Sequence, residues 1–132
     1  MAARASPPIH MQRIEDLTKA GVPDVYAICK GRSTWLELKA ARAYPKRNDT
    51  PVLGARGLLQ EQKNWHLTHS ANGGSVCTLI GVGSYDYYLI GGAASDLVNG
   101  WCATELTFNA ICYGSAPKFW IQLADFLLKG KE

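Results

Sequence analysis

The stretch Val25-Tyr-Ala-Ile-Cys-Lys-Gly-Arg-Ser-Thr-Trp-Leu-Glu-Leu38 decides the fold. Its first five residues are apolar, aromatic or β-branched, and residues 34–38 return to a similar composition, so the pattern predicts two buried strands. Residues 30–33 between them are polar and include Gly31, which is typical of a turn. We therefore expect the two strands to pair as an antiparallel hairpin.

The same signals place the other elements around this hairpin. In chain order we expect a helix at 12–20 ended by Gly21, the hairpin, a long basic loop at 41–57, a helix at 58–71, strands at 75–83 and 85–90, strand-like pieces at 101–103 and 106–108, and a helix from Pro117 to about Lys129. This order predicts an α/β fold, a small mixed sheet flanked by helices. The last helix carries an apolar stripe of Phe119, Leu123, Phe126 and Leu127, which we expect to dock on the core or on a second subunit.

Length and composition limit the class of protein. The chain has 132 residues, of which 47% are hydrophobic and 19% charged, so we expect one globular domain over 1–132 with a loose tail at 1–10. The N-terminus lacks the apolar segment of a secretory signal, and no stretch approaches the roughly 20 apolar residues of a membrane span. The cysteines (Cys29, Cys77, Cys102, Cys112) show no C-x-x-C spacing. All four are expected to be reduced, buried and inert in a cytoplasmic protein rather than to bind zinc.

Basic residues are concentrated in the first half of the chain. Residues 1–66 contain 11 Lys and Arg against 6 Asp and Glu, whereas residues 67–132 contain 3 against 5. An uneven distribution of this kind indicates a polyanionic partner such as a nucleic acid, although a solvated basic surface would look the same.

Three charged residues occur in or next to apolar strands, where we expect buried side chains. Asp24 opens the first strand of the hairpin, and Glu37 lies inside the apolar second strand. Lys39 points to the same face as Glu37, because side chains two apart in a strand share a face. A buried carboxylate is costly unless it is paired, so Lys39 could form a structural ion pair with Glu37. If Asp24 converges on the same place, a divalent cation such as Mg²⁺, with the Leu38 carbonyl as a further ligand, would remove the repulsion between the two acids.

These residues resemble a known family. Gly21-Val-Pro-Asp24 followed by Glu37-Leu-Lys39 is similar to the PD-(D/E)xK motif of nucleases with the restriction-endonuclease-like fold. Together with 31–40, 58–65 and 73–76, the motif resembles the small VRR-NUC nucleases, many of which are encoded by phages. The resemblance covers roughly residues 12–92 and leaves 93–132 as a C-terminal extension without a counterpart.

The resemblance implies a role for each matched residue. Asp24, Glu37 and the Leu38 carbonyl match the ligands of Mg²⁺ or Mn²⁺, and Lys39 matches the catalytic lysine. Glu15 matches a further acidic position that contributes to the metal site, and Gln62 matches a glutamine of the site. The helix pattern supports Gln62 independently: Leu58, Gln62, Trp65 and His69 share one face, which should pack on the sheet, and a glutamine there needs a polar partner. The metal site or the scissile phosphate could be that partner, or Gln62 could be a satisfied buried glutamine.

The predicted function is therefore a Mg²⁺-dependent endodeoxyribonuclease located in the cytoplasm, of the host if the chain is phage-encoded. The expected DNA contacts are Arg42, Tyr44, Lys46, Arg47, Arg56, Lys63 and His66. We expect His66 and His69 to be surface or phosphate-contacting residues rather than metal ligands. From its size and the family, the protein is expected to act as a homodimer on branched DNA, in the manner of a Holliday-junction resolvase. The dimer surface is expected in the apolar stripe of the last helix and residues 101–113. A monomeric flap nuclease, an RNA substrate and a non-catalytic nucleic-acid-binding phage accessory protein stay open as alternatives.

Overall fold

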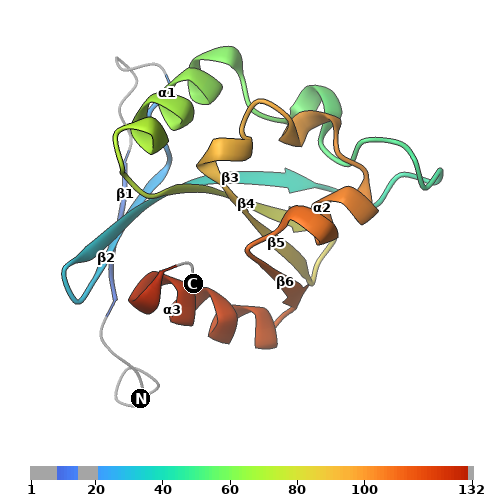
Figure 1. Cartoon of the computed structure of the whole chain (residues 1–132). Coiled ribbons are helices and arrows are strands. Elements are labelled where there is room, and N and C mark those ends of the chain that lie inside the picture. The colour runs from blue at the N-terminus through green and yellow to red at the C-terminus, as the bar shows by residue number, and fades with distance from the viewer. Residues whose placement is uncertain (1–8, 15–20, 131–132) are drawn as a thin grey trace.

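The computed structural model describes residues 9–14 and 21–130, which fold as an α/β unit built on one mixed sheet (Figure 1). The six strands are β1 (His10–Arg13), β2 (Val25–Cys29), β3 (Arg32–Ala41), β4 (Val76–Val82), β5 (Asp86–Gly91) and β6 (Cys112–Ser115). The helices are α1 (Gln60–Ala71), α2 (Ala103–Asn109) and α3 (Lys118–Lys129), with short 3₁₀ turns η2 (Gly54–Arg56), η3 (Gly92–Ala94) and η4 (Val98–Gly100). This confirms the predicted fold class, a small mixed sheet flanked by helices.

Strand order in the sheet follows chain order, from β1 to β6. The β2–β3 hairpin is antiparallel as predicted, and so are the pairs β1–β2, β4–β5 and β5–β6. The parallel pair β3–β4 is joined by the crossover that contains α1. A parallel pair needs such a connection, because the chain must return to the same end of the sheet before it can start the next strand. The helix packs against η3 and β4, and its Gln62 and Trp65 side chains reach the strand that carries Glu37 and Lys39.

Helices cover both faces of the sheet and create two cores. Figure 1 shows α1 and α2 on one side of the sheet and α3 on the other. On the α1 side, Ile80, Val82 and Ile90 pack with Leu58 and Leu106. On the α3 side, the packed residues are Ala27, Leu36, Cys77, Leu89, Phe119, Leu123, Phe126 and Leu127. The predicted apolar stripe of α3 thus packs into this core. Phe119 is fully buried, and Leu123, Phe126 and Leu127 are 2–6% exposed.

Two predictions about local structure are wrong. Residues 12 and 13 belong to strand β1 rather than to a helix, because His10–Arg13 pairs along Val25–Ile28. The remainder of that predicted helix, 15–20, lies outside the described residues, as does most of the predicted tail. The second error is at 101–108, where the structure has helix α2 in place of strand-like pieces. Its first turn is capped by Glu105, whose Oε1 accepts a hydrogen bond from the Cys102 backbone N–H at 3.0 Å.

The predicted basic loop forms between β3 and α1, interrupted by η2. Val52 and Leu53 anchor it in the core with 7% and 4% exposure. All four cysteines are free: Cys29 and Cys77 are buried as predicted, whereas Cys102 and Cys112 are only half-buried. Burial raises the pKa of Cys77 to about 12 and that of Cys112 to about 11, so neither is a reactive thiolate. In the part of the chain that the structure describes, no helix is long and apolar enough to cross a membrane.

Candidate functional site

The hairpin register brings Asp24 and Glu37 together. Val25 pairs with Leu36, so the next position along the register places Asp24 opposite Glu37. Ala27 and Leu36 face α3, and because side chains alternate along a strand, Asp24 and Glu37 face α1. Asp24 Oδ2 also accepts a hydrogen bond from the Leu38 backbone N–H at 2.9 Å. The convergence on which the predicted site depends is therefore present.

Glu37 is a buried acid with an unusual environment. The residue is only 2% exposed, and the pKa of its carboxyl is raised from 4.5 to about 8. Burial is the largest cause, the neighbouring Asp24 carboxyl raises the pKa further, and the Lys39 ammonium acts in the opposite direction. One carboxyl oxygen, Oε1, is buried and has no hydrogen-bond partner among the described residues. An unsatisfied buried oxygen beside a second carboxylate has the chemistry of a cation ligand.

Gln62 supplies the partner of the other Glu37 oxygen. It lies in the first turn of α1, and its Nε2 donates to Glu37 Oε2 at 3.1 Å. Its own Oε1 accepts from the Leu59 backbone N–H at 2.9 Å, so one side chain both caps the helix and fixes the acid. The polar partner expected for Gln62 is thus Glu37 itself.

Two residues outside the predicted set of site residues hold α1 in this position. Asn99, in η4, brackets Leu58 just before the helix: its Oδ1 accepts from the Leu58 N–H at 2.8 Å, and its Nδ2 donates to the Leu58 carbonyl at 2.9 Å. Gly21 lies against the first turn of α1 with φ of +86°, and a Cβ there would overlap the Glu61 carbonyl. A glycine at Gly21 was visible in the sequence as a helix stop, but nothing in the sequence marks Asn99.

We expect Gln62→Ala to lower the free energy of unfolding by about 1–3 kcal/mol, because it leaves Glu37 Oε2 and the Leu59 N–H without their partners. Gln60→Ala is the matched control, since Gln60 is exposed on the same helix and bonds only to the Asn64 side chain in the described residues. Urea unfolding of both variants measures the difference. Equal losses in the two variants would show that the Glu37 contact contributes nothing.

Lys39 lies on the same strand face as Glu37 and is half-buried. Its charge lowers the pKa of Glu37 and also that of His66, so it lies near both. However, the ion pairs between described residues are Arg47–Asp49 and Lys129–Asp125, and Glu37–Lys39 is not among them. Glu37 and Lys39 therefore do not form the ion pair that would give both residues a purely structural role.

His66 is placed differently from the prediction. It is fully buried, and its Nδ1 lies 3.0 Å from the hydroxyl oxygen of Ser95, which is fully buried too. Burial, then the Lys39 charge and then His69, lower the pKa of His66 to about 4, so the imidazole is neutral at physiological pH. A residue without accessible surface cannot contact DNA, so this predicted contact is wrong. His69 is half-buried and stacks on Trp65 with ring centroids 4.7 Å apart.

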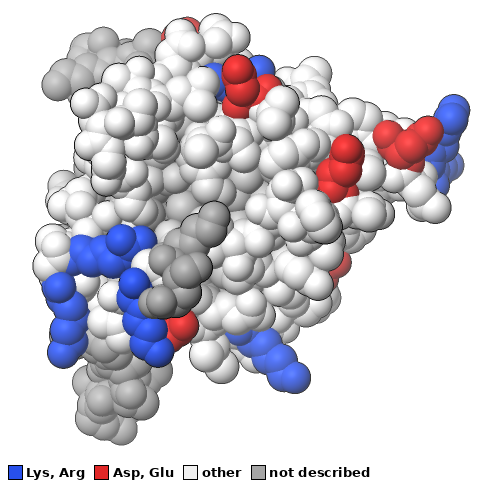
Figure 2. Space-filling model, viewed as in Figure 1, with Lys and Arg blue, Asp and Glu red and all other residues white. Residues whose placement is uncertain are grey.

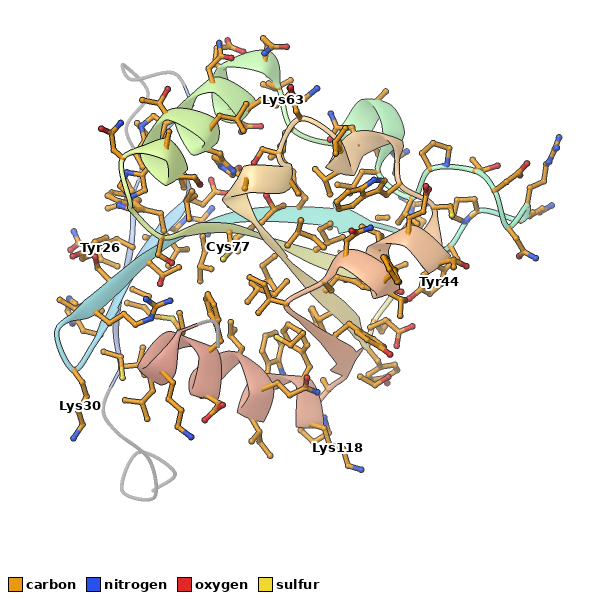
Figure 3. All side chains as sticks on the ribbon, viewed as in Figure 1. Tyr26, Lys30, Tyr44, Lys63, Cys77 and Lys118 are labelled. Carbon is orange, nitrogen blue, oxygen red and sulfur yellow. The ribbon has the colours of Figure 1, made fainter. Side chains whose placement is uncertain are left out.

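The other predicted DNA contacts lie in two places. Lys63 is on α1 next to Gln62, whereas Tyr44 lies beyond the end of β3 (Figure 3). Tyr44 donates its hydroxyl to Asp86 Oδ2 at 2.9 Å and shares a 2.7 Å bond with the Tyr88 hydroxyl, and burial and these bonds raise its pKa. These bonds connect the start of the loop to β5.

The loop also carries the exposed cations Arg42, Lys46, Arg47 and Arg56. Figure 2 shows positive and negative atoms together at its tip, where Arg47 Nε lies 3.6 Å from Asp49.

The donor set at Asp24 and Glu37 fits Mg²⁺ or Mn²⁺. It consists of two carboxylates and the Leu38 carbonyl, which points to the same side of β3 as the Leu38 N–H and hence toward Asp24. Within residues 9–14 and 21–130, no group of three or more His, Cys, Asp and Glu side chains forms a metal cluster. Further ligands would thus be the carbonyl and waters, which is usual for Mg²⁺. The third predicted acid, Glu15, lies outside the described residues.

No family model matches this chain, and no curated protein matches it. The functional interpretation therefore depends on the geometry of Asp24, Glu37, Lys39 and Gln62.

Proposed function

We propose that this protein is a metal-dependent DNA endonuclease of the PD-(D/E)xK type, related to the VRR-NUC nucleases. The observation that carries the proposal is the pairing of Asp24 with Glu37, whose Oε1 is buried and has no hydrogen-bond partner among the residues that the structure describes. Two acids forced together at this cost are explained by a cation that neutralises both of them. The basic first half of the chain supports a polyanionic substrate.

The residues of the site divide the chemistry of phosphodiester hydrolysis among them. Asp24, Glu37 and the Leu38 carbonyl would hold Mg²⁺, which when bound polarises a phosphoryl oxygen and lowers the pKa of a water molecule. Lys39, on the same face, holds the attacking hydroxide or stabilises the negative charge that develops on the phosphoryl group. Gln62 keeps the Glu37 carboxyl oriented, and the neutral His66 adds no second positive charge beside Lys39.

Dimeric action on branched DNA is the finer part of the proposal. The α3 stripe is buried within one chain, so it does not supply a dimer surface. Within the other predicted region, 101–113, Phe108 is 87% exposed and is available for contact between two copies. The non-catalytic alternative, a nucleic-acid-binding protein with a structural Glu37–Lys39 pair, is weakened because that pair is not formed in the structure.

Metal binding tests the proposal most directly. We expect wild type to bind Mn²⁺ and Asp24→Asn to bind it at least about tenfold more weakly, because asparagine keeps an acceptor for the Leu38 N–H but removes the charge. Isothermal titration calorimetry measures both affinities. Asp96→Asn is the matched control, since Asp96 is exposed. Mn²⁺ binding that is the same in wild type and Asp24→Asn would rule out the proposed site.

A further inference from the structure

Arg32 is a cation in an unusual place, at the start of β3 and on the opposite face from Glu37. Its guanidinium carbon lies 5.2 Å from the centroid of the Phe126 ring on α3, and Gly130 closes over the same group so tightly that a Cβ there would overlap it. Its Nε is buried without a hydrogen-bond partner in the described residues. Neither of the ion pairs between described residues involves Arg32.

A partly buried guanidinium without a carboxylate is costly, because it loses water without gaining an acceptor. Arg32 borders a cavity of about 460 Å³ that lies between the end of α1, the ends of β4 and β5, and α3. Glycines at positions 73, 74, 91 and 92 line part of it. At Gly73 a Cβ would meet nothing within 4 Å, so a ligand could approach the backbone there, whereas the His69 side chain fills that space at Gly74 and the Val76 and Ser70 side chains fill it at Gly92. The polar side chains of Ser70 and Asn109 face the same cavity.

The surroundings are positively charged as well. Lys30 lies at the turn of the β2–β3 hairpin (Figure 3), and Lys129 ends α3. Figure 2 shows Lys and Arg atoms gathered over this part of the surface, with one acidic patch beside them. Asp125, on α3, is paired with Lys129 at 3.1 Å. An anion approaching this end of the molecule would therefore meet a favourable potential.

We propose that the Arg32 cavity is a binding site for a phosphate group, separate from the Asp24–Glu37 site and independent of the proposed nuclease activity. Arg32 offers the planar fork of donors that binds phosphate bidentately. Ser70 lines the cavity from the end of α1 and Asn109 from the end of α2, so the Ser70 hydroxyl and the Asn109 N–H that is not used in the 2.8 Å bond to the Glu105 carbonyl could add donors to a phosphate. The volume leaves room for more than the phosphate alone, as ligand sites of this size usually do.

Binding of inorganic phosphate to the full chain tests the site, with the Arg32 Nε–Hε resonance followed by NMR. We expect a saturable shift of that resonance and a higher melting temperature with phosphate. Arg32→Lys should weaken phosphate binding at least about tenfold, because lysine keeps the charge but loses the fork. Lys118→Gln, which removes an exposed cation at the start of α3, should leave binding unchanged.

Asn109→Asp is a second variant, which carries the test if Arg32→Lys fails to fold. It puts a negative charge in the cavity wall and leaves the Arg32–Phe126 contact in place, so it should also weaken phosphate binding. Parallel titrations with a nucleoside 5′-monophosphate and with an oligonucleotide lacking a terminal phosphate distinguish a phosphomonoester from a phosphodiester as the source. A missing phosphate response, equal binding by the variants, or acetate binding as tightly as phosphate would overturn the assignment.

Discussion

Replacing Lys39 by alanine is expected to reduce DNA cleavage by at least about 100-fold while leaving Mn²⁺ binding intact. Loss of a single group that stabilises developing charge in a transition state costs 10²–10³ in rate. Lys39 sits two residues from Glu37 on one strand face, but it donates nothing to the two carboxylates that would hold the metal. Cleavage and metal affinity should therefore separate in this variant, whereas Asp24→Asn should lose both.

The measurement is cleavage of linear, flapped and four-way DNA with Mg²⁺ or Mn²⁺, compared between wild type and Lys39→Ala. Lys118→Ala is the matched control, because Lys118 is an exposed lysine at the start of α3 on the other side of the sheet. Wild-type cleavage rates in Lys39→Ala would refute the proposed catalytic role. The choice among the three DNA forms, together with the solution mass, decides between the dimeric and the flap-specific interpretations.

The hairpin could be predicted because its pattern is local. Alternation on β3 is enough to place Glu37 and Lys39 on one face, and the turn at Gly31 is enough to pair the two strands. Asp24 needs only the register, which a short turn fixes. The helix α1 was likewise visible, since Asn72-Gly73-Gly74 marks its end, although it begins at Gln60 rather than at Leu58.

The parts that could not be predicted depend on contacts distant in sequence. His66 reads as a polar helix residue, and only the fold shows that Ser95, 29 positions away, gives it a buried partner. Asn99 holds the start of α1 from 41 positions away. The prediction of a helix at residues 12–13 fails for a related reason. Their composition is compatible with a helix, but pairing with β2 makes them part of strand β1.

The cost of ionising the buried Glu37 carboxyl is expected to make the stability of the metal-free protein depend on pH. In the folded chain its pKa is about 8, against 4.5 for an ordinary glutamate. Between these values the folded protein holds a proton that the unfolded chain has released, so the free energy of unfolding must fall as pH rises. Below pH 4.5 both states are protonated, and the stabilising effect of the shift is complete.

The window from pH 6.5 to 8 isolates this effect. His66 has a lowered pKa, so its contribution to stability rises with pH between about 4 and 6.5 and opposes Glu37 there. Cys77 and Cys112 have raised pKa values, and their contributions fall only above pH 9. From pH 6.5 to 8 we expect the wild type in EDTA to lose about 1.6 kcal/mol. The slope approaches 1.36 kcal/mol per pH unit for one proton near pH 6.5 and halves by pH 8, where Glu37 is half ionised.

Glu37→Gln should remove this slope, because the amide has no proton to lose and its oxygen can still accept the bond from Gln62. Urea unfolding across pH 6.5–8 measures both proteins, and Glu61→Gln, an exposed acid on α1, is the control that should keep the wild-type slope. Adding Mg²⁺ to wild type should restore stability most at pH 8, since the metal binds the ionised carboxylates and competes with the proton. Parallel pH profiles in wild type and Glu37→Gln would mean that Glu37 is not the buried, proton-holding acid on which the proposed metal site depends.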